Sequence, residues 1–335
     1  MLNLERVYFY DEHPKPATML DEVLQGLATR PRRIAPKFFY DERGSRLFDA
    51  ICELPEYYLT RTEMDILECC AEDVARLAGP DTTLIELGSG ASRKIRLLLE
   101  ALRPRRYFGI DISREFLKQS VQSLAQDYPW LEVHAACADF MQDLHLPYGA
   151  EEGKKLAFFP GSTIGNFEPQ EALTFLQQVR RMVQPDGALL IGVDLKKDPN
   201  LLHAAYNDGA GITAQFNLNL LYRLRAELGA QVNPQGFQHR AFYNAVRGRI
   251  EMHLVSRFAQ DIRIQGQRFY FEPGESIHTE NSYKYTLEEF HAIARAAGLR
   301  PRQVWLDASR LFGVHYLSVV GNTPRLSPGM GVFPD

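Results

Sequence analysis

From residue 82 the chain alternates short apolar stretches with longer amphipathic ones. The apolar stretches are TTLIEL, YFGIDI, LEVHAAC, KLAFFPG and ALLIGVD. Helical spacing fills three of the gaps between them, at residues 92–102, 113–126 and 170–183. Strands that are apolar through most of their length and separated by helices are typical of a parallel sheet covered on both faces. The sequence therefore predicts an α/β, doubly wound, Rossmann-like sheet.

The flanking regions have different patterns. Residues 1–80 have mostly helical spacing, so we expect a helical N-terminal segment. Residues 196–285 contain two helical patterns and then alternating stretches with a glycine turn, which indicate an inserted α+β lobe. Residues 286–322 return to a helix followed by two strands that we expect to pair antiparallel. The sheet core is thus predicted over 81–195 and 286–322.

The first strand ends in Gly88, Ser89 and Gly90, and the second ends in Asp111. Such a turn lets a ligand approach the backbone, and an acid at the next strand end commonly binds ribose hydroxyls. The alternative is a tight turn with Asp111 capping the next helix.

Arg93 occupies the place of the third glycine in a dinucleotide fingerprint, which disfavours a nicotinamide cofactor. Asp139 and Phe140 follow the third strand, where an acid and a ring suit an adenine. Three strand ends therefore favour S-adenosyl-L-methionine as the ligand.

Overall composition excludes several protein classes. The 335 residues carry 38 Lys and Arg against 42 Asp and Glu, a net charge of −4, so no nucleic-acid partner is expected. Four cysteines lack a C-x-x-C motif and nine histidines lack H-x-x-x-H spacing, so neither disulfides nor a metal site are predicted. No window approaches the ~18 apolar residues of a membrane span, and the N-terminus is charged. We expect a cytoplasmic protein that does not bind membranes.

The fourth strand leads into Gly165 and Asn166, in FFPGSTIGNF. An amide at this strand end supplies both donors and an acceptor beside a reacting methyl group. The Asn/Asp-Pro-Pro-aromatic motif of DNA amine methyltransferases is absent. The pattern favours a small amine as the acceptor.

Several blocks together resemble the L-histidine Nα-methyltransferases of ergothioneine biosynthesis. They include FFYDERGSRLFDAICELPEYYLTRTE, IELGSGASRKIRLLLEAL, FFPGSTIGNF, AYND, IEMHL and HTENSYKY, and the similarity extends from about residue 17 to 322. The resemblance implies a class I methyltransferase fold that trimethylates histidine to hercynine. It implies that S-adenosylmethionine is held by Gly88, Ser89, Lys94, Asp111, Asp139 and Phe140.

The resemblance also implies an acceptor site, part of it in the N-terminal segment and part in the inserted lobe. The α-amino and carboxylate ends of histidine would contact Tyr57, Gly161, Asn166 and Tyr206, with Tyr40 and Phe48 as walls. Glu280 and Ser282 would face the imidazole, with Met252 packed nearby. Tyr40 and Asn166 are our hypothesis for the groups that aim the amine lone pair. Asn281 departs from some family members, which have an apolar residue there.

Two alternatives remain open from the residues themselves. One is a methyltransferase of the same fold that acts on another amino acid, such as a tryptophan derivative, or on a ring nitrogen of histidine. An indole would be better served by an apolar group at position 280. The other is a non-catalytic S-adenosylmethionine-binding module, which would need no amide at Asn166. We expect a monomer in each case.

Overall fold

An eight-stranded sheet forms the core of the computed structural model, which describes residues 7–11, 16–90, 93–141 and 153–319. The strand order is β1-β5-β4-β3-β6-β7-β14-β13. The strands are β1 (Val7–Asp11), β3 (Thr83–Leu87), β4 (Arg106–Asp111), β5 (Glu132–Cys137), β6 (Lys155–Phe159), β7 (Ala188–Asp194), β13 (Leu299–Leu306) and β14 (Phe312–Val319). Neighbours from β1 to β7 are parallel, whereas β14 runs antiparallel to both β7 and β13.

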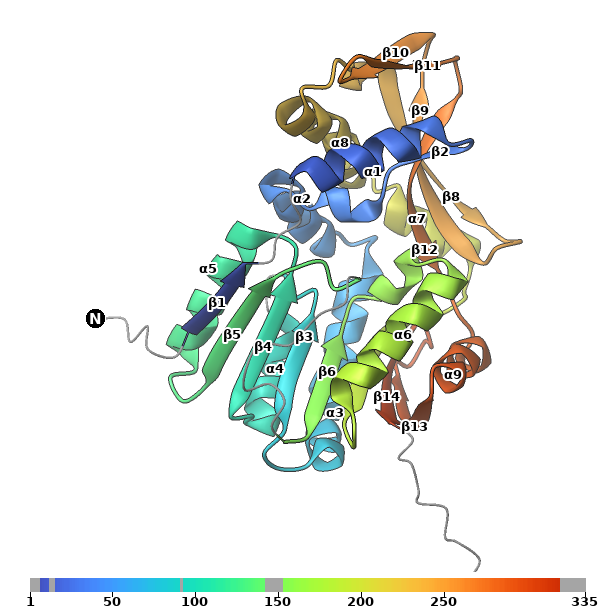
Figure 1. Cartoon of the computed structure of the whole chain (residues 1–335). Coiled ribbons are helices and arrows are strands. Elements are labelled where there is room, and N and C mark those ends of the chain that lie inside the picture. The colour runs from blue at the N-terminus through green and yellow to red at the C-terminus, as the bar shows by residue number, and fades with distance from the viewer. Residues whose placement is uncertain (1–6, 12–15, 91–92, 142–152, 320–335) are drawn as a thin grey trace, which may run out of the picture.

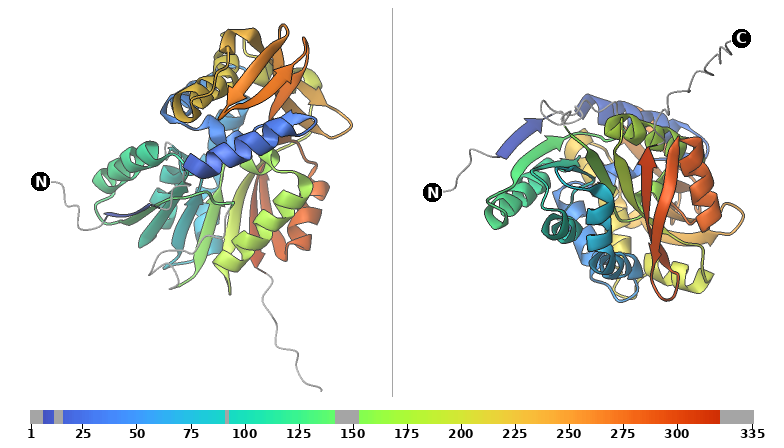
Figure 2. Two further views of the ribbon diagram at one scale, coloured as in Figure 1. Left: turned by 45° about the horizontal axis from the view of Figure 1, so that its top comes forward. Right: turned by 90° about the horizontal axis from the view of Figure 1, so that it is seen from below.

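Helices cover both faces of this sheet (Figure 2). One face packs against α3 (Tyr58–Ala78), α4 (Arg93–Leu102) and α5 (Arg114–Asp127), and the other against α6 (Pro169–Val183) and α9 (Leu287–Ala296). Side chains alternate along each strand. Leu84 therefore packs in the core on the face covered by α3, α4 and α5, and Ile85 packs in the core on the face covered by α6 and α9. The predicted doubly wound α/β fold is confirmed.

The order of strands reverses at β3, which pairs with β4 on one side and β6 on the other. In doubly wound sheets, this switch point leaves a crevice at the carboxyl ends of the strands. The Gly88–Gly90 turn follows β3 directly, so the fold places the predicted ligand site in that crevice.

A second lobe lies above those carboxyl ends (Figure 1). Its four-stranded sheet has the order β2-β12-β9-β8, with a separate β10-β11 hairpin. The strands are β2 (Arg32–Arg33), β8 (Phe237–Asn244), β9 (Arg249–Ser256), β10 (Gln260–Ile264), β11 (Gln267–Phe271) and β12 (Ser276–Tyr283). The helices and short 3-10 turns of this half are α1 (Pro16–Ala28), η2 (Pro36–Phe39), α2 (Glu42–Cys52), η3 (Thr163–Asn166), α7 (Pro199–Tyr206), α8 (Ile212–Leu228) and η4 (Pro234–Gly236).

The N-terminal segment, for which mostly helical spacing predicted helices, also contains two short strands. Residues Val7–Asp11 form an edge strand parallel to β5, and Arg32–Arg33 pair with Ile277 and His278 of β12. Neither strand was predicted, because the sequence VYFYD of β1 does not alternate apolar and polar residues and β2 has two residues. The N-terminal segment consequently joins both sheets. No helix in the described ranges is long and apolar enough to cross a membrane.

Candidate active site

A cavity of about 680 Å³ opens at the carboxyl ends of β3, β4, β5 and β6, beneath the N-terminal helices. Twelve of the residues singled out in the sequence line it. They are Tyr40, Phe48, Tyr57, Gly88, Ser89, Gly90, Lys94, Asp111, Asp139, Phe140, Gly161 and Asn166. The other four, Tyr206, Met252, Glu280 and Ser282, belong to the lobe and are not among the residues that line this cavity.

The glycine turn and Asp111 form the floor of the cavity. Gly88 has a φ of +76°, a backbone conformation that a glycine adopts without strain. The backbone N–H of Gly90 donates to Asp111 Oδ2 (3.0 Å), and that of Ser113 donates to Oδ1 (2.8 Å). Burial raises the pKa of Asp111, and these donors act against that rise. The turn and the acid therefore hold each other in place.

Asp139 and Phe140 lie just after the end of β5. Asp139 is buried and accepts from Met141 N (3.0 Å), and its second oxygen is paired with Lys37 Nζ (2.9 Å). Phe140 packs edge-on against Phe159, with ring centroids 5.5 Å apart. The carboxylate predicted to meet an adenine is thus also an anchor for the N-terminal segment.

Two buried acids in the cavity region were missed by the sequence reasoning. Glu63 of α3 is fully buried, pairs with Lys94 Nζ (2.5 Å) and accepts from Gly161 N (2.8 Å). Both Gly161 N and Lys94 are therefore already engaged by this side chain. Glu86 within β3 accepts from Tyr107 Oη (2.6 Å), and burial raises its pKa to about 8. The feature of the sequence that could have identified them is an acidic residue on an otherwise apolar helix face, for Glu63, or within an otherwise apolar strand, for Glu86.

Aromatic rings connect the cavity to the lobe. Ring centroids of Tyr40 and Phe48 lie 5.7 Å apart, those of Phe48 and Tyr57 6.4 Å, and those of Tyr57 and Tyr206 6.2 Å. Burial, with the nearby charge of Glu280, raises the pKa of Tyr40 and Tyr57 well above the usual value. These phenols stay protonated at neutral pH and can donate hydrogen bonds, but they are poor bases.

Behind Tyr206 lies a buried polar network that only the structure reveals. Lys284 Nζ is fully buried and contacts Asp194 Oδ2 (2.6 Å), Ser282 Oγ (2.8 Å) and Tyr206 Oη (3.2 Å). Tyr58 also donates to Asp194 (2.8 Å). Burial alone would lower the pKa of Lys284, but Asp194 and Tyr206 raise it above the ordinary value. The lysine is therefore a fixed cation under the predicted imidazole site.

The number of protons on Ser282, Tyr206 and Lys284 limits the hydrogen bonds that the two hydroxyl groups can form. Lys284 donates to both Ser282 and Tyr206, and the two hydroxyl oxygens lie 2.7 Å apart. One hydroxyl proton is used between them, and the other has no acceptor among the described side chains. The network therefore presents one spare O–H donor.

Glu280 lies close to this network and to the aromatic wall, which is formed by Tyr40, Phe48 and Tyr57. Burial raises its pKa to about 7, and the charge of Lys284 opposes the rise. Glu280 pairs in register with Met252 of β9, and Asn281 points to the opposite face of β12, where it donates to Glu168 Oε1 (3.1 Å). The departure at Asn281 thus leaves the Glu280 side of the strand unchanged.

Asn166 is joined to the same strand through close packing. It ends η3 and lines the cavity. A Cβ on the preceding Gly165 would come within 2.8 Å of Tyr283 O, so only glycine lets η3 lie this close to β12. The amide on the cavity wall is therefore positioned by the strand that carries Glu280.

A model of the family described as histidine-specific, SAM-dependent methyltransferases matches residues 19–319. The chain belongs to this family. The histidine N-alpha-methyltransferase of Mycolicibacterium smegmatis is 41% identical over 299 residues, which cover 88% of this chain and 92% of that protein. Ergothioneine biosynthesis protein 1 of Neurospora crassa is 32% identical, covering 86% of this chain and 33% of that protein.

Among solved structures, the methyltransferase CcbJ of Streptomyces caelestis has a TM-score of 0.45 and 17% identity. The match covers 76% of this chain and 88% of that one. S-adenosylmethionine is the methyl donor of the family. One observation of this structure fits such a ligand directly, because the buried Oγ of Ser89 on the cavity wall has no hydrogen-bond partner among the described residues.

Proposed function

We propose that this enzyme transfers methyl groups from S-adenosylmethionine to the α-amino nitrogen of L-histidine, in three successive steps that give hercynine, as part of ergothioneine biosynthesis. The observation that carries this proposal is that one cavity exposes both the Gly88–Gly90 turn with Asp111 and the amide of Asn166. Direct methyl transfer requires a donor site and an acceptor site within the same cavity.

The donor half of the cavity suits the cofactor. Asp111 would accept from the ribose hydroxyls, and Ser89 would complete its unused hydrogen bond. Asp139 and Phe140 would flank the adenine, and Lys94 with Glu63 would border the amino-acid end. When bound, S-adenosylmethionine supplies an electrophilic methyl group on a sulfonium.

The acceptor amine must be neutral to attack, and this chain achieves that without a strong base. A free α-amine has a pKa of about 7.7–8.0, so a useful fraction is already deprotonated at neutral pH. Asn166 accepts or donates as the amine turns, and Tyr40 and Tyr57 donate hydrogen bonds to the amino-acid end. Positioning and exclusion of water are the main contributions of these groups.

Glu280 and the Lys284 network would recognise the imidazole from two sides. The Glu280 carboxylate accepts from one ring N–H, and the spare hydroxyl of the Ser282–Tyr206 pair donates to the other nitrogen. A ring without two such nitrogens would leave buried polar groups unpaired, which is costly. This arrangement supports histidine over an indole-bearing amino acid.

The aromatic wall suits a product that becomes a quaternary cation. Tyr40, Phe48 and Tyr57 line the cavity with ring faces and edges. Aromatic faces stabilise alkylated ammonium groups by about 0.5–2 kcal/mol. The aromatic wall can thus keep the partly methylated intermediates bound as each methyl group is added.

The test is to incubate purified enzyme with S-adenosylmethionine and each standard amino acid, and to follow masses by mass spectrometry with fragmentation. We expect gains of one, two and three methyl groups on histidine alone, all on the α-nitrogen. Methylation of another amino acid or of a ring nitrogen would overturn the acceptor assignment. No mass gain, with cofactor binding intact by calorimetry, would make the chain a binding module.

A further inference from the structure

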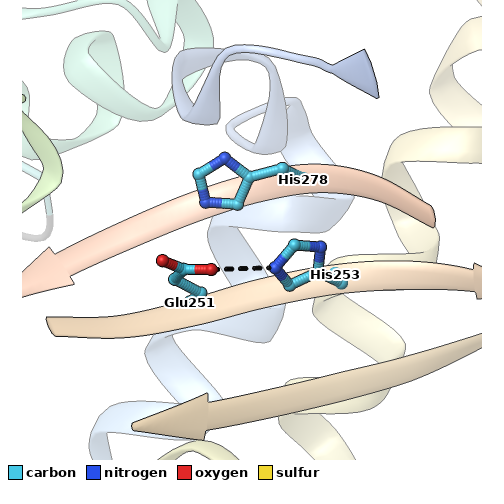
Figure 3. A group of neighbouring side chains, drawn as sticks. All are labelled: Glu251, His253 and His278. Carbon is cyan, nitrogen blue, oxygen red and sulfur yellow. Dashed lines mark hydrogen bonds and ion pairs between the residues drawn. The ribbon is translucent and has the colours of Figure 1, made fainter. Parts of the chain in front are cut away.

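Three metal-ligating side chains meet on the face of the lobe sheet opposite Met252 and Glu280. Glu251 and His253 are two residues apart on β9, and His278 pairs directly with His253 from β12. One ligand atom from each lies within 4.8 Å of the other two. Figure 3 shows the two imidazoles and the carboxylate turned toward one another. Because cross-strand pairing brings these residues together, their spacing along the sequence did not predict a metal site.

An irregularity in β12 puts His278 on this face. The register with β9 shifts between His278 and Glu280, so His278 pairs with His253 and Glu280 with Met252. In a regular strand, residues two apart share a face. The extra residue of the bulge turns His278 and Glu280 to opposite faces. The bulge therefore brings a second imidazole beside the first.

The ligand atoms, which lie within 4.8 Å of one another, would have to move closer together to enclose an ion. Glu251 Oε2 lies 3.3 Å from His253 Nε2, and the two imidazole centroids are 4.9 Å apart. Ligand atoms at about 2.0–2.1 Å from a tetrahedral zinc ion lie roughly 3.4 Å from one another. His278 Nε2, now 3.0 Å from the carbonyl oxygen of Glu280, would exchange that hydrogen bond for the ion.

Outer contacts already orient two of the three ligands. His253 Nδ1 lies 3.1 Å from Ser276 Oγ, so its Nε2 is directed at Glu251. Arg249 Nε and Asn244 Nδ2 donate to Glu251 Oε1 (2.8 and 3.1 Å), and Oε2 is left toward the imidazoles. Hydrogen bonds to the non-ligating atoms are typical of protein metal sites, because they fix ring orientation. The side chains of Glu251 and His253 are 11% and 15% exposed, so an ion can reach them from solvent.

We propose that Glu251, His253 and His278 bind one divalent transition-metal ion of the Zn²⁺ or Co²⁺ type, with water in the remaining position. Two imidazoles and one carboxylate suit such borderline ions, whereas Mg²⁺ and Ca²⁺ prefer shells of oxygen. The ion would clamp β9 to β12 at the rungs whose other face carries Met252 and Glu280. The site is separate from the methyl-transfer cavity, since none of its three residues lines that cavity.

The test is a titration of the tag-free, chelator-treated full chain with Zn²⁺ by calorimetry, and with Co²⁺ by visible absorption. We expect one ion per chain, a tetrahedral Co²⁺ spectrum that Zn²⁺ abolishes, and no heat with Mg²⁺. His253→Gln and His278→Gln should each weaken Zn²⁺ binding at least tenfold, and the double variant at least 100-fold. The matched control, His203→Gln on the exposed side of α7, should bind as the wild type does.

Glu251→Gln provides a variant that keeps an oxygen for Arg249, so weaker binding there with an unchanged thermal transition would support a ligand role. Far-UV circular dichroism of every variant identifies any that fail to fold, and a single folded variant suffices for the comparison. Unchanged stoichiometric binding in the folded double variant would overturn the proposal. So would a wild-type chain that binds Zn²⁺ no more tightly than millimolar.

Discussion

The proposed donor half and the proposed acceptor half of the site are built in different ways. The donor half uses the turn after β3 and the acid after β4, joined by short backbone hydrogen bonds such as Gly90 N to Asp111 Oδ2. The acceptor half uses fully buried charges, Asp194 at the end of β7 and Lys284 directly after β12. In the proposed function, local backbone geometry would therefore support cofactor binding, whereas long-range electrostatics would support recognition of the acceptor.

Removal of the buried cation is expected to have the largest effect. Lys284→Met leaves the Asp194 carboxylate with Tyr58 and Lys197 as its partners among the described side chains, and it removes the ammonium donor of Ser282 and Tyr206. Breaking a buried pair costs about 3–5 kcal/mol, so we expect the free energy of unfolding in urea to fall by about 3 kcal/mol. Lys118→Met, at the surface, is the control and should change it by less than about 0.5 kcal/mol. An unchanged Lys284→Met protein would show that the network is not structural.

Loss of the donor-half acid should affect the cofactor alone. Asp111→Asn removes the charge that the ribose hydroxyls would meet, so affinity for S-adenosylhomocysteine should fall about 100-fold by calorimetry. The Km for histidine should stay within about twofold at saturating cofactor. Asp127→Asn on the exposed end of α5 is the matched control. Equal losses for cofactor and histidine would contradict the division into two halves.

Loss of the acceptor-half acid should produce the converse result. Glu280→Gln weakens the partner of the imidazole, and kcat/KM for histidine should fall about 30-fold, mostly through KM. Cofactor affinity should remain that of the wild type. Glu272→Gln, exposed after β11, controls for a general loss of negative charge. A wild-type KM in the Glu280 variant would remove this residue from the acceptor site.

The pH dependence of the free energy of unfolding should reflect the raised pKa of Glu280. Its folded pKa of about 7 lies above the ordinary 4.5, so the folded chain holds a proton that the unfolded chain releases in this window. This contribution to stability is present below pH 4.5 and is lost as the pH rises through about 7. Glu280→Gln should therefore gain about 1–2 kcal/mol relative to the wild type between pH 5 and pH 8, by urea unfolding. A pH-independent difference would show that Glu280 has an ordinary pKa.

The smallest effect is expected from a substitution of Tyr40, in the aromatic wall between the donor half and the acceptor half. Tyr40→Phe keeps the ring contacts with Phe48 and removes one hydrogen-bond donor. We expect kcat/KM to fall about fivefold, with an unchanged thermal transition, because one neutral hydrogen bond contributes about 1 kcal/mol. Wild-type rates for every methylation step would exclude Tyr40 from orienting the amine.

The two halves also differ in how far the sequence predicted them. Gly88, Gly90 and Asp111 were found because a turn and a strand end are local patterns, and the predicted fold brings them together. Glu63 and Glu86 were missed because a single acid among apolar residues reads as a surface group, whereas both are buried beside the cavity. The strands β1 and β2 were missed because their pairing partners lie more than a hundred residues away.

The sequence by itself determined the doubly wound sheet, the position of the glycine turn at its switch point and the family of the enzyme, since these depend on periodicity and contiguous motifs. Only the tertiary structure decided that Lys284 supports Ser282 and Tyr206, and that Asn281 faces away from Glu280. The same is true of the meeting of Glu251, His253 and His278. The physical reason is that burial, strand register and a bulge determine which side chains share a space, and none of these is written in residue spacing.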